Sequence, residues 1–271
     1  MDIKRVSSAL LGFPLVVIML IVGNKYVVDI FLALIALIAM QEYFNAVSKK
    51  CNPVRWVGYL SCISIALVHI LPENLPEQIM TSIIMIVLPT ILLILFAQVI
   101  ITNMKTNFKD IAYTLLGIIY VISCIIFLAL LRGLEKGIIL IWYGIIAAWG
   151  TDIFAYLIGM KFGKHKFSEV SPKKSIEGSV AGVIGAVILT LLYTVAINSL
   201  CKLNYSYLYI ALATAALSII GQIGDLAASS IKRYVEVKDY SNLIPGHGGM
   251  LDRIDSLMFL APFAYILFSI I

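Results

Sequence analysis

Residues 178–200 read GSVAGVIGAVILTLLYTVAINSL, and no charged side chain interrupts them. A helix needs about 20 apolar residues to cross the ~30 Å hydrocarbon core of a bilayer. Comparable runs recur along the 271-residue chain, which is 61% hydrophobic and only 13% charged. Soluble globular domains carry charge on roughly a quarter of their residues, so the composition excludes that class. The predicted fold class is all-α, a polytopic membrane helical bundle, because lipid offers backbone groups no hydrogen-bond partners.

Short polar breaks divide the apolar runs into nine predicted transmembrane helices. Their predicted ranges are 6–23, 26–47, 54–72, 78–102, 109–131, 138–160, 178–200, 206–229 and 251–271. The last of these is purely apolar only from Leu257 onward, which is short for a crossing.

The basic residues set the expected orientation in the membrane. With the N-terminus inside, only four of the 20 basic residues fall outside: Lys25, Arg132, Lys136 and Lys202. The positive-inside rule therefore predicts a cytoplasmic N-terminus and, with nine spans, a C-terminus on the outer side. We expect a multi-pass protein of the cell (inner or plasma) membrane. The net charge of +5 follows this topology, so we expect no nucleic-acid partner.

The two halves of the chain differ in their loops. Residues 1–136 consist of plain spans with short connections, and we interpret them as a scaffold that faces lipid. Residues 137–271 contain two long polar segments, 161–177 and 230–256, which the predicted topology places in the cytoplasm. We therefore expect the catalytic region in residues 137–271, with the active site on the cytoplasmic face.

Acidic residues occur inside several apolar runs. Asp152 and Asp225 lie in the cytoplasmic halves of their predicted spans, where an ionisable group is costly and usually functional. The alternative is an interfacial carboxylate paired with a nearby lysine. Glu42 is a weaker case, for which a structural pairing and a role at the site are equally plausible interpretations.

Five acidic and four basic residues lie between residues 224 and 256, and three of the acids are candidates for one metal site. Asp252 and Asp255 are three residues apart, so both point to one side at the start of the last helix, and Asp225 precedes them. Mg²⁺ bound to a polyphosphate takes one or two carboxylates and completes its shell with phosphate oxygens and water. We therefore expect Mg²⁺ at Asp225, Asp252 and Asp255, and leave open a second cation, monovalent or divalent. Basic side chains that could neutralise the remaining phosphate charge are Lys232, Arg233, Lys238 and Arg253.

A glycine-rich turn, Pro245 to Gly249, precedes the last helix. Glycines such as Gly248 and Gly249 adopt positive φ and let backbone amides approach an anion. The N-terminus of the following helix would add its dipole to the attraction. His247 could donate to a phosphate or move a proton, although a lone loop histidine is more often simply solvated.

The other polar segment, residues 161–177, also carries hydrogen-bond donors suited to phosphate. The hydroxyl and ammonium groups belong to Ser171, Lys173, Lys174 and Ser175. The alternative interpretation is a polybasic patch on anionic lipid, worth about 1 kcal/mol per lysine near the surface.

These stretches together resemble a known family. Ser230-Ile-Lys-Arg, Lys238-Asp239 and the run from Ile244 to Asp255 resemble the signature of the phosphatidate cytidylyltransferases, or CDP-diacylglycerol synthases. Residues 171–178, SPKKSIEG, are similar to the family's Ser-Pro-Lys-Lys-Thr-x-Glu-Gly, with Ser175 in place of the usual threonine. The resemblance covers residues 149–256, where Asp152, Tyr156, Gly159 and Gly163 also fit.

The resemblance implies an integral membrane enzyme that uses CTP and phosphatidic acid to form CDP-diacylglycerol and pyrophosphate with Mg²⁺. It implies metal binding by Asp225 and Asp252, with Asp255 close by. The expected catalytic residues are Asp225, Asp252, Lys232, Arg233 and His247. The expected substrate-binding residues are Asp152, Ser171, Lys173, Lys174, Ser175, Ser230, Lys238, Asp239, Gly248, Gly249 and Arg253.

Alternative functions remain compatible with these residues. A CTP-dependent cytidylyltransferase or kinase could act on another membrane lipid, such as an ether-isoprenoid phosphatidate or a polyprenol. An ion-coupled transporter would use midplane acids, whereas these acids cluster toward one face. The expected partners are CTP, phosphatidic acid and membrane lipid, and a homodimer is left open.

Overall fold

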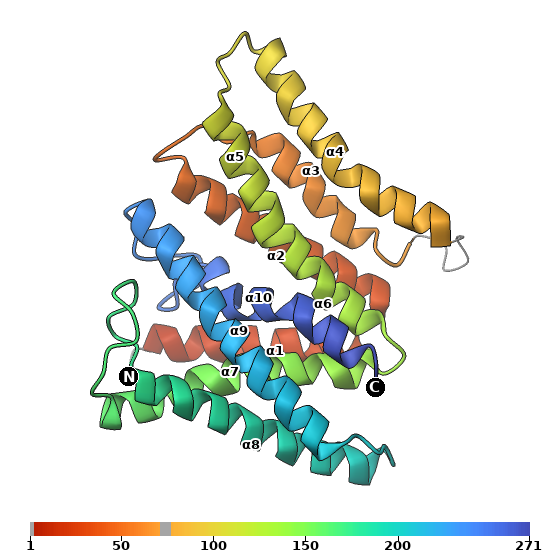
Figure 1. Cartoon of the computed structure of the whole chain (residues 1–271), viewed down its shortest axis with the longest axis vertical. Helices are drawn as coiled ribbons and strands as arrows, with labels where there is room; N and C mark the ends of the chain where they lie inside the picture. The colour runs from red at the N-terminus through yellow and green to blue at the C-terminus, as the bar shows by residue number, and fades with distance from the viewer. Residues whose placement is uncertain (1–2, 71–76) are drawn as a thin grey trace. The chain divides into compact units, whose positions relative to one another are not determined.

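The computed structural model describes residues 3–70 and 77–271, and this part of the chain is almost entirely helical (Figure 1). The helices of the first half are α1 (Ile3–Val22), α2 (Lys25–Val47), α3 (Arg55–Ala66), α4 (Glu77–Ile101), α5 (Phe108–Gly117), the π-helical turn η1 (Ile118–Ile122) and α6 (Ser123–Gly133). Those that follow are α7 (Gly137–Phe162), α8 (Ile176–Leu200), α9 (Tyr207–Tyr234) and α10 (Leu251–Phe268). The prediction of an all-α chain is confirmed.

Five of the described helical segments are long and apolar enough to cross a membrane. They are Lys25–Val47, Phe108–Gly133, Gly137–Phe162, Ile176–Leu200 and Tyr207–Tyr234. The segment predicted at 54–72 behaves differently: α3 has only 12 residues, about 18 Å of helix against a ~30 Å hydrocarbon core, and residues 71 and 72 lie outside the described part. The count of nine crossings therefore stays a prediction.

The chain divides into two compact units, which are described separately. The first, unit 1, contains residues 1–129 and 237–252, and the second, unit 2, contains residues 130–236 and 253–271. Residues 237–252, the glycine-rich signature segment, thus belong with the N-terminal helices. The assignment of a scaffold role to residues 1–136 and a catalytic role to residues 137–271 concerns function and stays a prediction.

In unit 1, α2 packs against α3 and α5. The fully buried rings of Tyr43 and Phe44 on α2 lie 5.8 Å apart between centroids. The Tyr43 hydroxyl donates to the backbone oxygen of Tyr113 at 3.0 Å. The buried Asp110 carboxylate accepts from the backbone N–H groups of Asn52 (2.7 Å) and Asn107 (2.9 Å). Aromatic packing and capped helix ends thus fix the frame around α2.

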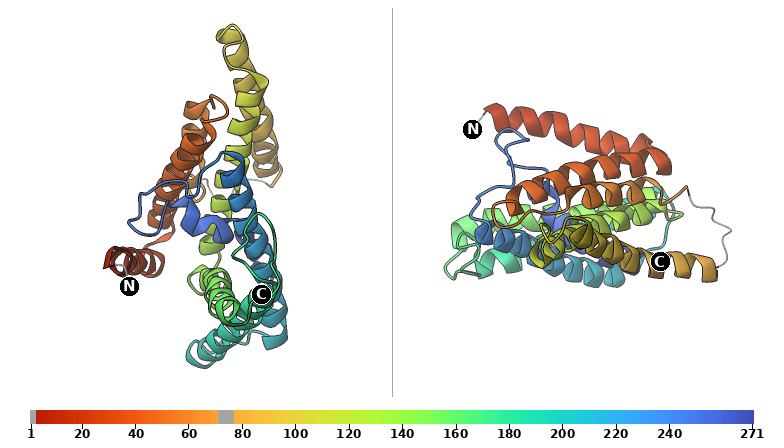
Figure 2. Two further views of the ribbon diagram at one scale, coloured as in Figure 1. Left: turned by 90° about the vertical axis from the view of Figure 1, so that its left-hand side faces the viewer. Right: turned by 90° about the horizontal axis from the view of Figure 1, so that it is seen from above.

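In unit 2, α7 and α8 run side by side, as Figure 1 and the left view of Figure 2 show. Glycines on α8 permit the close approach: a Cβ at Gly178 would lie 2.7 Å from the Ala155 backbone oxygen, and one at Gly182 would lie 2.8 Å from that of Thr151. The Thr151 hydroxyl also lies 2.6 Å from the Ser218 hydroxyl on α9. Small residues and interhelical hydrogen bonds are typical of helix packing in lipid, where the hydrophobic effect gives no drive for association.

From Arg253 onward, α10 packs on α7 and α9 within unit 2. The Tyr143 and Phe268 rings lie 5.3 Å apart between centroids, and the Tyr209 hydroxyl donates to the Leu267 oxygen at 2.6 Å. Gly224 on α9 faces Phe259 and the backbone of Asp255, where a Cβ would find no room. This close approach sets α9 and α10 side by side one residue before Asp225.

Candidate active site

Three of the predicted acidic residues gather within unit 2. Asp152 on α7, Asp225 on α9 and Asp255 on α10 are close enough to interact electrostatically with one another. Asp255 is only 6% exposed, and its Oδ1 accepts from the Ser256 backbone N–H at 2.8 Å. Three carboxylates this close repel one another, so the arrangement favours a cation among them.

Basic side chains surround the three acids. Lys174, from the segment before α8, forms an ion pair with the Asp225 carboxylate. Lys232 interacts electrostatically with Asp255, and Arg253 with Asp152. The structure therefore brings together six of the predicted site residues, three acids and three bases, from four segments of the chain.

The three acids do not form a closed metal cage. Among the described residues, no group of three or more His, Cys, Asp or Glu side chains is placed to hold a metal ion. Mg²⁺ needs only one or two protein carboxylates when phosphate oxygens and water complete its shell. The oxygen donors Asp225 and Asp255 therefore fit Mg²⁺ as a chemical set, shared with a polyphosphate.

The segment between α7 and α8 folds into a short hairpin-like loop. Lys166 and Ser175 form an antiparallel bridge, and the Phe167 N–H donates to the Lys174 oxygen at 2.9 Å. Ser175 is the N-cap of α8, where its hydroxyl accepts from the Gly178 N–H at 3.1 Å. The serine that replaces the usual threonine thus keeps a structural hydroxyl, and the loop positions Lys174 beside α9.

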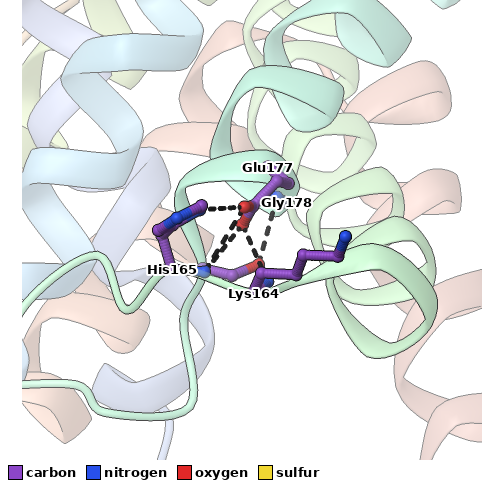
Figure 3. Close-up of polar contacts among 5 residues, drawn as sticks. Lys164, His165, Glu177 and Gly178 are labelled. Carbon is purple, nitrogen blue, oxygen red and sulfur yellow. Dashed lines mark hydrogen bonds and ion pairs between the residues drawn. The ribbon is translucent and has the colours of Figure 1, made fainter.

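Figure 3 shows a contact that sequence reasoning missed, between His165 and Glu177. The His165 Nδ1 lies 2.6 Å from Glu177 Oε1, and the same carboxylate accepts from the Lys164 backbone N–H at 3.1 Å. Glu177 therefore ties the first residues of the loop to the first turn of α8. Its position two residues after the N-cap Ser175 is the sequence signal that could have indicated this role.

In unit 1, the glycine-rich segment forms a tight turn. The His247 N–H donates to the Ile244 oxygen at 2.9 Å, with Pro245 and Gly246 as the central residues. Gly246 has φ of 77°, as the third position of a type II turn requires, and Gly248 has φ of 85°. The expectation of positive φ in this turn is therefore confirmed at Gly246 and Gly248, whereas it is wrong for Gly249.

Asp252 closes this turn from the first turn of α10. Its Oδ2 accepts from the backbone N–H groups of Tyr240 (2.9 Å) and Gly249 (3.0 Å), and the residue is 8% exposed. One oxygen of the predicted metal ligand is thus used to hold the loop.

We expected the N-terminus of α10 to bind an anion, but protein carboxylates accept hydrogen bonds from its backbone N–H groups. The backbone N–H groups of Met250 and Leu251 donate to Glu42 on α2, and that of Gly249 donates to Asp252. The proposed use of these amides for phosphate is therefore corrected: protein carboxylates already satisfy them. Phosphate binding by this segment would use other donors.

The remaining predicted residues lie at the ends of these elements. Ser230 and Arg233 are exposed near the end of α9, Lys173 is exposed in the loop before α8, and Ser171 there is half-buried. Lys238 and Asp239 are exposed in the 237–252 segment, where His247 is half-buried. The site prediction as a whole is therefore divided: Lys238, Asp239, His247, Gly248, Gly249 and Asp252 belong to unit 1, and the others to unit 2.

Comparison with known proteins gives the family. The model of the cytidylyltransferase family matches residues 3–271. The chain belongs to this family. This cytidylyltransferase-family chain is 32% identical over 264 residues to the phosphatidate cytidylyltransferase of Staphylococcus haemolyticus, covering 97% of both chains. The resemblance stated from the signature residues is thus confirmed.

Two further relatives carry the same name. The phosphatidate cytidylyltransferase of Bacillus subtilis is 37% identical over 187 residues, 68% of each chain. That of Thermotoga maritima is 44% identical over 127 residues, which cover 46% of this chain and 47% of the relative.

Proposed function

We propose that this chain transfers the cytidylyl group of CTP to phosphatidic acid and so forms CDP-diacylglycerol and pyrophosphate. The family match and the relatives named phosphatidate cytidylyltransferase support this function. The structural observation that carries it is the cluster of Asp152, Asp225 and Asp255 with Lys174, Lys232 and Arg253. A paired set of acids and bases suits a reaction between two polyanions.

In this reaction a phosphate oxygen of phosphatidic acid attacks the α-phosphorus of CTP. The new O–P bond forms as the bond from the α-phosphorus to the α,β-bridging oxygen breaks, and pyrophosphate leaves with the electron pair of the broken bond. The phosphate nucleophile is already ionised at neutral pH, so the chain's main tasks are positioning and charge neutralisation. Lys174, Lys232 and Arg253 would offset the negative charge of the two substrates.

We also propose Mg²⁺ as the cofactor, held by Asp225 and Asp255 in unit 2; the metal role of Asp252, in unit 1, rests on the family signature alone. When bound, Mg²⁺ would neutralise phosphate charge and orient the triphosphate. The support is the chemistry of the oxygen donors and the mutual repulsion of the acids. When substrate binds, the Lys174 ammonium group would then leave Asp225 and pair with a phosphate.

The proposed place of the protein is the cell membrane, with the polar segments at 161–177 and 230–256 in the cytoplasm, where CTP is found. The five membrane-length helices and the bias of basic residues toward these segments support this placement. The nine crossings and the cytoplasmic N-terminus belong to the same proposal. Labelling of single cysteines placed at Lys164 and Lys202 in intact cells tests the orientation, because only the Lys202 side should react with an impermeant reagent.

Purified protein in detergent with Mg²⁺, CTP and phosphatidic acid tests the function directly. We expect release of pyrophosphate and formation of a CDP-lipid, with both lost on addition of EDTA and restored by excess Mg²⁺. Diacyl and ether-isoprenoid phosphatidates, assayed side by side, identify the preferred lipid. Absence of a CTP-dependent product with every phosphatidate would contradict the proposed function.

A further inference from the structure

Glu42 on α2 contacts the signature segment 241–251 with both of its carboxylate oxygens. Oε1 accepts from the Ser241 hydroxyl at 2.6 Å and from the Met250 backbone N–H at 2.9 Å. Oε2 accepts from the Leu251 backbone N–H at 2.8 Å. The residue is 4% exposed, and all of these groups belong to unit 1.

The three donors explain why an acid is tolerated at this buried position. A buried carboxylate is costly unless several donors satisfy it. The donors here include the first backbone N–H groups of α10, which have no partners within their own helix. Negative charge at a helix N-terminus is also favoured by the helix dipole. Glu42 therefore acts as a cap for α10 that comes from a different helix.

Gly249 makes the contact specific. A Cβ at this position would lie 2.6 Å from Glu42 Oε2 and 2.8 Å from Oε1. Glycine is needed here because the carboxylate occupies the space of a side chain. The Gly249 N–H itself donates to Asp252, so two carboxylates hold the same short segment.

We propose that Glu42 is a positioning residue of the cytidylyl-transfer reaction. It holds segment 241–251 and the start of α10, and thereby sets the place of Asp252, without touching substrate. The inference rests on the proposed function. It gives α2 a positioning role in the reaction, although the family signature lies in the other half of the chain.

Glu42→Gln tests the proposal with little change of shape. A glutamine has one oxygen and an NH₂ group where three donors converge, so at least one N–H of segment 241–251 loses its acceptor. We expect kcat to fall on the order of 10- to 100-fold at saturating CTP and phosphatidic acid. Hydrogen–deuterium exchange in the peptide 241–252 should become faster in the same variant.

Asp110→Asn is the matched control. Asp110 is also a buried acid of unit 1 that accepts backbone N–H groups, from Asn52 and Asn107, outside the 237–252 segment. We expect this variant to lower the thermal midpoint in detergent to a similar extent as Glu42→Gln, with kcat and the exchange of peptide 241–252 close to those of the wild type.

A double-mutant cycle adds a readout that general destabilisation would not move. Gly249→Ala should reduce kcat because its methyl group displaces the Glu42 carboxylate. In Glu42→Ala the space is open, so adding Gly249→Ala should cost little more, and the two effects should be strongly non-additive.

Three results would overturn the proposal: wild-type kcat in Glu42→Gln, an unchanged exchange rate in peptide 241–252, or additive effects in the cycle. Failure of the proposed function is recognised separately, because the wild-type protein itself would then make no CDP-lipid. In that case the exchange measurement still decides whether Glu42 holds the segment.

Discussion

The Lys174 ammonium group is paired with the Asp225 carboxylate, and the pair joins the loop before α8 to the middle of α9. Both side chains keep partial solvent access, with exposed fractions of 29% and 22%. An ion pair of this kind contributes about 1 kcal/mol or less to stability. Under the proposed function, Lys174 would bind a phosphate and Asp225 a metal ion, so we assign the pair a role in substrate binding.

The first prediction concerns this pair. Lys174→Ala should raise the KM for CTP at least about tenfold, since one charge-assisted phosphate contact is worth roughly 1.5–3 kcal/mol. Asp225→Asn should abolish turnover while the protein still folds. Steady-state kinetics and thermal unfolding in detergent measure both effects, with Lys105→Ala in unit 1 as the control. A KM for CTP in Lys174→Ala equal to that of the control would contradict the assignment.

The second prediction separates the two tasks of Asp252. Asp252→Asn keeps an oxygen that can accept from Tyr240 and Gly249, so the fold should survive while turnover is lost. Asp252→Ala leaves two buried N–H groups without an acceptor, at a cost of about 1–3 kcal/mol each. Its thermal midpoint should therefore lie well below that of Asp252→Asn. Equal midpoints for the two variants would show that the hydrogen bonds to Asp252 do not stabilise the loop.

The third prediction concerns the helix contact that carries Asp152. Gly182→Ala places a methyl group against the Thr151 backbone oxygen, and such overpacking costs about 1–3 kcal/mol. Gly144→Ala on α7 meets its nearest neighbour, Leu260, at an ordinary 3.4 Å and should be tolerated. Thermal midpoints in detergent distinguish the two variants. If both variants unfold at the wild-type temperature, the α7–α8 contact is looser than described.

The fourth prediction concerns the His165–Glu177 contact. Glu177→Gln should loosen residues 164–175, because the carboxylate that binds Lys164 and His165 is lost. The His165 side chain is 74% exposed, so the thermal midpoint should change little. Limited proteolysis within the loop should become faster, and the KM for CTP should rise because Lys174 is less well placed. Unchanged proteolysis would mean that the β-bridge alone holds the loop.

Several parts of this molecule are readable from local sequence. The boundaries of α7, α8 and α9 follow from the lengths of their apolar runs and fall within a few residues of the expected positions, except at the end of α9. That helix continues to Tyr234, past the predicted end at 229, because its last turns are polar and lie beyond the apolar run. The turn at Pro245 and Gly246 also follows from local conformational preference.

The missed features depend on partners that are distant in sequence. Glu42 is separated from Ser241 by 199 positions, and nothing in the residues around it says whether it pairs with a lysine, a metal or a helix end. No local sequence signal pairs His165 with Glu177, twelve positions away, which it contacts beside the bridge between Lys166 and Ser175. The α10 amides appeared available to phosphate because sequence does not show which carboxylate caps them.

The sequence by itself determined the all-helical membrane class, the family and the identity of the acids and bases, because hydropathy and signature spacing are local properties of the chain. The tertiary structure decided which of those groups meet. It placed Asp152, Asp225 and Asp255 together through the close glycine contacts among α7, α8, α9 and α10. It also joined the glycine-rich segment to α2 through the hydrogen bonds to Glu42. The physical reason is that hydrogen bonds and ion pairs need distances of about 3–4 Å. Only the packing of helices far apart in sequence sets such distances.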